Sequence, residues 1–68
     1  MQCDLLKGKI KEKGMNQSEV AEKIGMSLSR FNAKLNHKDN AEFTLGEVYA
    51  IKDVLGLSTE QTTKIFLT

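Results

Sequence analysis

The 68-residue chain has one cysteine, one histidine and no proline, and these shortages exclude several classes of protein. A lone Cys3 cannot close an internal disulfide, and a lone His37 leaves no cluster of Cys and His with zinc spacing. No apolar run approaches the roughly 18 residues of a membrane span, and no signal-peptide core follows Met1. We therefore expect a cytoplasmic protein without metal, cofactor, small-molecule ligand or membrane partner.

The length of the chain predicts a single domain that covers residues 1–68. Such a small domain has a thin core, because it buries only about 60% of the surface that its unfolded chain exposes. Without a disulfide or a metal, its stability must come from well-formed helices and tight apolar packing, and a second subunit is a further source.

The net charge of +1 hides an uneven distribution. Residues 1–38 carry eight Lys/Arg and four Asp/Glu, whereas residues 39–68 carry two and five, so the two parts have charges of +4 and −3. A basic half predicts an anionic partner, and ordinary surface scatter is the alternative interpretation. Nine of the ten cations are lysines, which hold phosphates as point charges, and Arg30 is the exception.

Apolar periodicity predicts five helices and no convincing strand, so the expected class is all-α. The helices are expected over about Cys3–Lys13 and from Asn16, Ser27, Thr44 and Ser58, with a polar loop from His37 to Glu42.

Local signals mark both ends of these helices. Capping boxes are predicted for Asn16 with Glu19, for Thr44 with Glu47 and for Ser58 with Gln61. Gly14, Gly25 and Gly56 each follow an apolar-periodic stretch, and we expect them to adopt positive φ at a helix end.

The most informative segment is residues 17–36, QSEVAEKIGMSLSRFNAKLN. Two short helices meet there at a turn of about three or four residues that contains Gly25, which is the helix-turn-helix layout. Ala21 is expected where the two helices cross, and a larger side chain would push them apart. The apolar residues expected to fix the angle between them are Val20, Ile24, Phe31 and Leu35.

This segment resembles the helix-turn-helix of phage Cro and repressor proteins, the Xre-like family. The matching residues are Gln17, Ala21, Ile24-Gly25-Met26-Ser27, Phe31 and Leu35-Asn36. The chain from about Asp4 to Leu67 fits the compact five-helix, lambda-repressor-like fold of that family. Its ending, LGLSTEQTTKIF, resembles short phage-encoded members from low-GC Gram-positive hosts.

The resemblance implies that the third helix enters the major groove of DNA and reads base edges. The residues then expected to face the bases are Ser27, Leu28, Ser29, Asn32, Ala33 and Asn36. Leu28 is either scattered surface apolarity or a contact to a thymine methyl, and Asn32 could pair with adenine. Relatives often carry Gln at the positions of Leu28, Ser29 and Ala33, so the operator sequence stays open.

Phosphate contacts are expected on either side of that helix. The candidates are Gln17, Arg30, Lys34, His37, Lys38 and Asn40. Gln17 stands at a helix N-terminus, where free N–H groups attract phosphate. The alternative for each of these residues is a solvated surface side chain. The lysines of the first helix spread around it, so most are expected to be solvated, and Lys11 or Lys13, near the second helix, are favoured as phosphate partners.

The sequence thus predicts a sequence-specific regulator of transcription, of repressor type, that binds double-stranded DNA at an inverted repeat as a homodimer in a bacterial nucleoid. Whether Ile65, Phe66 and Leu67 belong to the core or to the dimer interface stays open. The alternative is an antitoxin-like or adaptor module that binds protein, since the net charge is low for a DNA binder. No enzyme is expected, because no catalytic set is present and a lone His37 cannot build a triad.

Overall fold

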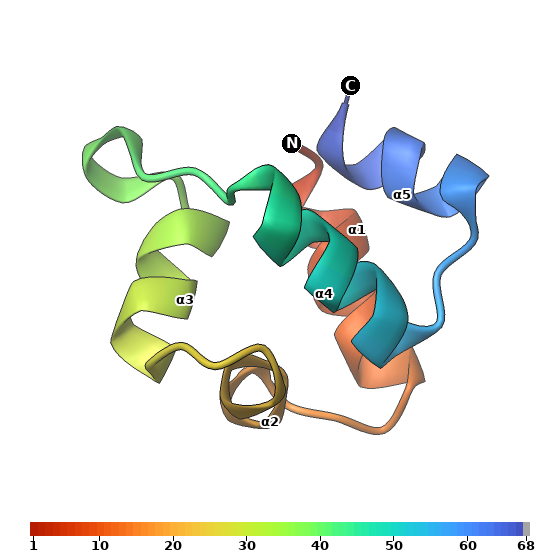
Figure 1. The fold of residues 1–68 in the computed structure, drawn as a ribbon, viewed down its shortest axis with the longest axis horizontal. Helices are drawn as coiled ribbons and strands as arrows, with labels where there is room; N and C mark the ends of the chain where they lie inside the picture. Colours follow the sequence, from red (N-terminus) through yellow and green to blue (C-terminus); the bar gives the residue numbers. More distant parts are fainter. Residues whose placement is uncertain (68) are drawn as a thin grey trace.

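Side-chain caps define where four of the five α-helices begin (Figure 1). The structure, a computed structural model, describes residues 1–67, and no strand occurs in this range. The helices are α1 (Cys3–Glu12), α2 (Gln17–Lys23), α3 (Leu28–Leu35), α4 (Leu45–Leu55) and α5 (Thr59–Phe66). All three predicted capping boxes are present, and Ser27 caps α3 by accepting a hydrogen bond from the backbone N–H of Arg30. The predicted all-helical class with five helices is confirmed.

Three helices end at a glycine in the left-handed conformation, as predicted, with φ of 72° at Gly14, 77° at Gly25 and 62° at Gly56. In each case, the N–H after the glycine bonds to a carbonyl five residues earlier, which is the Schellman arrangement. These bonds join Met15 to Ile10, Met26 to Ala21 and Leu57 to Lys52. The residue after each glycine is apolar and lies in or against the core, so each turn also contributes to packing.

All five helices contribute to one apolar core. Its buried members among residues 1–67 are Leu6, Ile10, Val20, Ala21, Phe31, Leu35, Ile51, Leu55, Leu57 and Ile65. Phe43, which precedes α4, lies between two other rings, with centroids 5.5 Å from Phe31 and 6.0 Å from Phe66. This row of aromatic rings links α3 to α5, which are far apart in the sequence.

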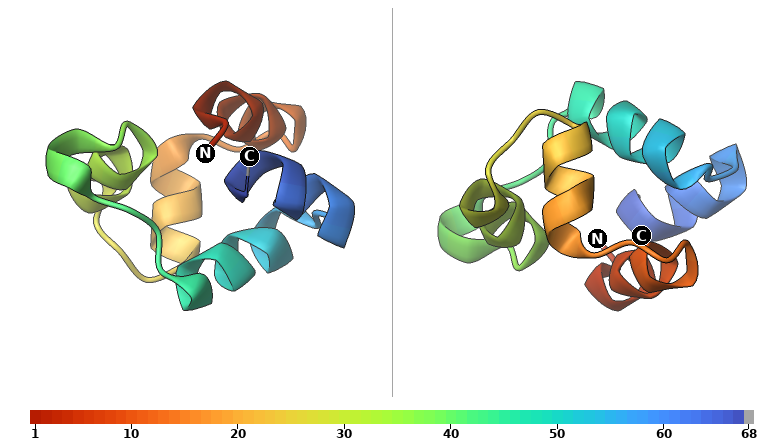
Figure 2. Two further views of the ribbon diagram at one scale, coloured as in Figure 1. Left: turned by 90° about the horizontal axis from the view of Figure 1, so that it is seen from above. Right: turned by 90° about the horizontal axis from the view of Figure 1, so that it is seen from below.

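The helices α1, α2, α4 and α5 surround this core, and α3 packs against it through Phe31 and Leu35. α2 packs against α1, α3 and α4, and α5 packs against α1 and α4. The two ends of the described range lie side by side (Figure 2), where the N–H of Gln2 donates a 2.6 Å hydrogen bond to the carbonyl of Ile65. The Cα radius of gyration is 10.7 Å, close to the roughly 11 Å of a compact chain of this length.

The main neighbours of α3 are α2 and the turn that follows α3 itself. In Figure 1 this helix forms one edge of the molecule. Its exposed residues are Leu28, Ser29 and Arg30, and Asn32 and Ala33 are half-buried. The expected polar loop contains a 3₁₀ turn, η1 (Lys38–Asn40). Left-handed backbone in this loop occurs at His37, Asp39 and Asn40.

The C-terminal apolar residues divide between the inside and the outside. Ile65 is buried, Phe66 is half-buried, and Leu67 is 78% exposed. Leu45, the first residue of α4, is also exposed. It precedes the buried Ile51 by six residues, so the two side chains lie on different sides of the helix. None of the helices in residues 1–67 is long and apolar enough to cross a membrane.

Candidate nucleic-acid interface

The packing of α2 against α3 sets the position of the candidate interface. Val20 and Ala21 of α2 and Phe31 and Leu35 of α3 are buried in the same core, and Ile24 lies half-buried against it. Ala21 is only 1% exposed, so a larger side chain would force its neighbours to move. Because the inner side of α3 is used in this packing, the other side is presented outward in a fixed orientation.

The outer side of α3 brings together most of the residues expected to read bases. Ser29, Asn32, Ala33 and Asn36 line one shallow hollow, and Lys38 of the following turn lies at its edge. A second hollow, which we call the α1–α3 hollow, is lined by residues of α1, of the start of α2 and of α3. From the expected set it contains Gln17, Leu28 and Asn32. Asn32 lines both hollows.

Two of the expected base-reading residues already make hydrogen bonds within the chain. The Ser27 hydroxyl accepts the N–H of Arg30 at 3.2 Å, and the side-chain amide of Asn36 donates to the carbonyl of Asn32 at 3.0 Å. The side chains of Ser29 and Asn32, in contrast, make no hydrogen bond to another residue in the range 1–67. Among the expected base-reading residues, Ser29 and Asn32 can therefore use all their side-chain donors and acceptors to bond outside the chain.

Leu28 is 42% exposed at the start of α3. It lines the α1–α3 hollow together with Ile10 and Met15, so part of its side chain has apolar neighbours and part is open to solvent. This intermediate environment leaves a methyl group of Leu28 available to an apolar contact outside the chain.

Lys34, one of the expected phosphate-binding residues, is held inside the molecule. Its Nζ lies 2.6 Å from Oε1 and 2.9 Å from Oε2 of Glu47, and the side chains are 12% and 21% exposed. Since Glu47 also accepts the N–H of Thr44 in its capping box, this one carboxylate joins α3 to the start of α4. Lys34 is thus the least available of the expected phosphate-binding cations.

The carboxyl group of Glu47 is perturbed by these contacts. Partial burial alone raises the pKa of Glu47, but the hydrogen bonds from Lys34 and Thr44 and the positive charge of Lys34 outweigh it. The pKa of Glu47 is therefore lowered from its usual 4.5, and the ion pair is present at neutral pH.

The other expected phosphate-binding residues lie on the surface. Gln17 is half-buried at the start of α2, and the exposed members are Arg30, His37, Lys38 and Asn40. Nε2 of His37 is 4.0 Å from Oε1 of Glu42, a long contact between two exposed groups. Arg30 lines neither hollow, so the structure does not bring it to the same place as Lys38.

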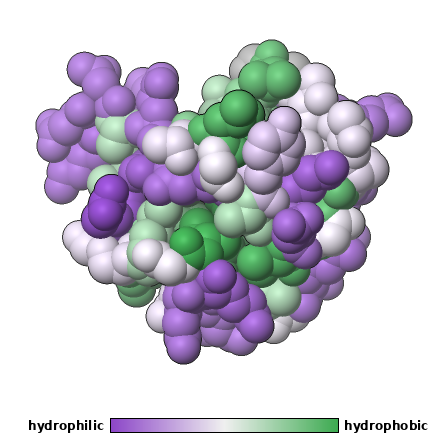
Figure 3. All heavy atoms as spheres, in the orientation of Figure 1, coloured by the Kyte–Doolittle hydropathy of each residue, from purple (hydrophilic) through white to green (hydrophobic). Residues whose placement is uncertain are grey.

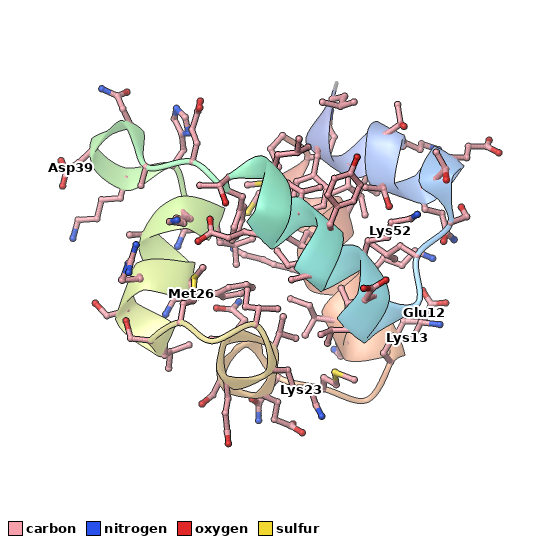
Figure 4. All side chains as sticks on the ribbon, viewed as in Figure 1. Glu12, Lys13, Lys23, Met26, Asp39 and Lys52 are labelled. Atoms are coloured by element: carbon pink, nitrogen blue, oxygen red, sulfur yellow. The ribbon has the colours of Figure 1, made fainter. Side chains whose placement is uncertain are left out.

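Hydrophilic surface is visible at two places beside α3 in the view of Figure 3. Figure 3 shows hydrophilic residues over the end of α3 and its following loop at the upper left, and again over α2 at the bottom. Figure 4 shows Asp39 at the outer edge of that loop, whereas Met26, in the turn between α2 and α3, lies toward the core. The loop after α3 is the most peripheral part of this surface.

Sequence reasoning did not find the pair of Lys34 with Glu47. Of the lysines of α1 it favoured Lys11 or Lys13 as phosphate partners. The structure places Lys11 in the α1–α3 hollow together with Lys7, which was not expected there, and Lys13 lines neither hollow. The spacing of Lys7 and Lys11, one helical turn apart, is a signal that they share a face of α1, but it does not say which neighbour that face meets.

Within residues 1–67, no three His, Cys, Asp or Glu side chains lie close enough together to hold a metal ion. No protein-family model, no curated protein and no solved structure matches the chain.

Proposed function

We propose that this chain is a sequence-specific DNA-binding regulator of transcription. In this proposal α2 and α3 form a helix-turn-helix, and α3 enters the major groove of double-stranded DNA. Ser29 and Asn32 bond to base edges, Leu28 contacts a thymine methyl, and Ala33 and Asn36 lie against the same bases. Arg30, Lys38, His37, Asn40 and Gln17 contact phosphates, while Lys34 keeps its partner Glu47.

The observation that carries the proposal is the composition of α3 on its open side. α3 is packed on one side only, and the side away from the core presents hydroxyl, amide and methyl groups. The helix has no Asp or Glu between Leu28 and Leu35, so no carboxylate repels the phosphates that flank a groove. The side chains of Ser29 and Asn32 have no hydrogen-bond partner within residues 1–67, so they can bond to the donors and acceptors on the edges of DNA bases. The absence of carboxylates lets the helix approach the negatively charged phosphates.

The likeness to phage Cro and repressor proteins of the Xre-like family supports the same proposal through the residues Gln17, Ala21, Gly25 and Phe31. We accordingly propose a phage or prophage repressor from a low-GC Gram-positive host, which acts in the cytoplasm on the nucleoid. A single α3 can read only a few base pairs, so we propose a homodimer on an inverted repeat, with its two reading helices about 34 Å apart.

A selection from random DNA duplexes with the purified chain tests the proposal. We expect enrichment of a short inverted repeat, to which binding weakens linearly in log affinity against log salt concentration. A folded chain that enriches no sequence would contradict sequence-specific binding.

A second candidate function, an antitoxin-like or adaptor module that binds protein, is favoured by one observation. Leu45 and Tyr49 lie one turn apart on α4 and are 69% and 58% exposed, which is unusual for large apolar side chains so close together. A partner protein that shifts the NMR signals of Leu45 and Tyr49, together with a failed DNA selection, would favour this second function.

A further inference from the structure

The α1–α3 hollow is lined by two cations, Lys7 and Lys11, that do not belong to the surface proposed above to contact DNA. Lys7 and Lys11 lie one turn apart on α1 and line the hollow opposite Leu28 and Asn32 of α3. The hollow has a volume of about 470 Å³ and is open to solvent. Two lysines of α1 thus stand beside the helix that is proposed to read DNA, although they precede it by about 20 residues in the sequence.

The charges in this hollow are all of one sign. Its lining includes Lys7 and Lys11 and no Asp or Glu. Neither lysine forms an ion pair with another residue of the described range, whereas Lys9 pairs with Glu12 at 3.2 Å and Lys34 pairs with Glu47. Lys7 and Lys11 are therefore the cations of α1 that combine a free ammonium group with a position next to α3.

We propose that Lys7 and Lys11 bind phosphates of the DNA strand that borders one side of the groove entered by α3. This inference rests on the proposed function and extends the DNA-binding surface from α2 and α3 to α1. A helix in the major groove, which is about 12 Å wide, has a phosphate backbone on each side of it. Lys38 lines the hollow on the other flank of α3, so cations stand on both sides of the reading helix.

The chemistry of the hollow selects a polyanion and not a small ligand. Lys7 and Lys11 are both exposed and act as hydrated point charges, which suits a flexible line of phosphates better than one tightly held group. Among residues 1–67, no buried polar side-chain atom lacks a hydrogen-bond partner, so no buried polar group awaits a small ligand in the hollow. These contacts position the protein on DNA without reading its sequence.

The salt dependence of DNA binding tests this inference. A short fluorescein-labelled duplex of mixed sequence is titrated with the full chain at salt concentrations between about 50 and 200 mM, and log affinity is plotted against log salt. The test variant is Lys7→Gln with Lys11→Gln. The matched control is Lys13→Gln with Lys23→Gln, which removes the same charge from two exposed lysines that lie on the opposite side of α2 from α3 in the view of Figure 4.

Each lost phosphate contact lowers the magnitude of the slope of log affinity against log salt by about 0.9. We therefore expect the test variant to lower this magnitude by roughly 1 to 2. The control variant should change it by less than about 0.5. Lys7→Arg with Lys11→Arg should keep the original slope, and circular dichroism should show that all variants melt near the temperature of the original chain. Equal slopes for the test and control variants would overturn the inference while leaving the proposed function intact. If the unchanged chain shows no salt-dependent binding, the proposed function itself fails.

Discussion

Asn32 holds the central position among the residues proposed to read DNA. It lines both hollows beside α3, and its side chain makes no hydrogen bond to another residue in the range 1–67. Its amide offers two donors and one acceptor oxygen, the combination that pairs with the edge of adenine. Asn36, one turn further along α3, is less free, because its amide bonds back to the carbonyl of Asn32.

Replacing Asn32 by alanine should therefore weaken specificity and leave folding intact. We expect Asn32→Ala to cost roughly 1–3 kcal/mol at one base pair of the selected site and to leave the melting temperature almost unchanged. Competition binding with single-base variants of the site measures the effect. Gln2→Ala, which removes an exposed amide next to α5, is the control. An equal loss of affinity for all duplexes would show that Asn32 does not read a base.

Glu47 has a structural role that can be measured separately from DNA binding. In Glu47→Gln the side-chain oxygen can still accept the N–H of Thr44, but the charge that holds Lys34 is lost. Since Lys34 is only 12% exposed, we expect a loss of about 1–2 kcal/mol, or a fall of roughly 5–15 °C in melting temperature at neutral pH. Glu60→Gln, at an exposed position in the first turn of α5, should change stability by less than about 0.5 kcal/mol.

The same pair predicts how stability depends on pH. The pKa of Glu47 is lower in the folded chain than its usual 4.5, so its contribution is present above about pH 4.5 and is lost as the pH falls through the folded value. The difference in melting temperature between the original chain and Glu47→Gln should accordingly be constant near neutrality and shrink below pH 4.5. A difference that grows on acidification would contradict the ion pair.

At the scale of the helices, the local signals were sufficient to predict most of the structure. Each capping box needs only residues three apart, and each glycine turn needs only the end of one helix, so neither depends on the rest of the fold. α1 ends at Glu12, one residue before the predicted end at Lys13, because Lys13 is already the C-cap. The predicted starts of the four later helices are confirmed.

Replacement of glycine by alanine is expected to have opposite effects on the free energy of unfolding at Gly8 and at Gly25. A Cβ at Gly8 or at Gly25 would meet no atom within 4 Å, but Gly25 has a φ of 77° whereas Gly8 is inside α1. Gly8→Ala should raise stability by about 0.5–1 kcal/mol, because alanine restricts the unfolded chain and favours the helix. Gly25→Ala should lower it by about 1–2 kcal/mol through left-handed strain. Chemical denaturation of both variants measures these changes, and a stabilising Gly25→Ala would contradict the turn geometry.

Contacts between elements could not be predicted in the same way. Lys34 and Glu47 are 13 residues apart, and nothing in the local pattern of either helix indicates that they meet. The sequence also predicted only a polar loop after α3 and did not predict the left-handed φ that His37, Asp39 and Asn40 adopt there. For the candidate site, helical periodicity was enough to predict which residues of α3 face outward. The position of Lys7 and Lys11 beside α3 could not be predicted in this way, because it depends on how α1 packs.

At the scale of the whole molecule, α5 connects the end of the described chain to its beginning. Ile65 is 2% exposed and its carbonyl bonds to Gln2, whereas Leu67, two residues later, lies on the surface. The apolar end of the described chain is thus part core and part open surface.

Two alanine substitutions distinguish the buried residue Ile65 from the exposed residue Leu67. Ile65→Ala should destabilise the chain by about 2–5 kcal/mol, because it leaves a cavity in the core. Leu67→Ala should change the melting temperature of the monomer by little, since its side chain is mostly outside. Thermal melts at low protein concentration measure both effects. Similar losses for the two variants would show that Leu67 is buried.

Contact between DNA and the open side of α3 can be mapped residue by residue. The measurement is an NMR titration of the isotope-labelled chain with the duplex obtained by selection. We predict that the largest changes in amide signals fall between residues 27 and 36, with smaller changes at Lys7, Lys11 and Gln17. Changes concentrated on α4 or α5, with the signals of residues 27–36 unmoved, would contradict DNA contact through α3.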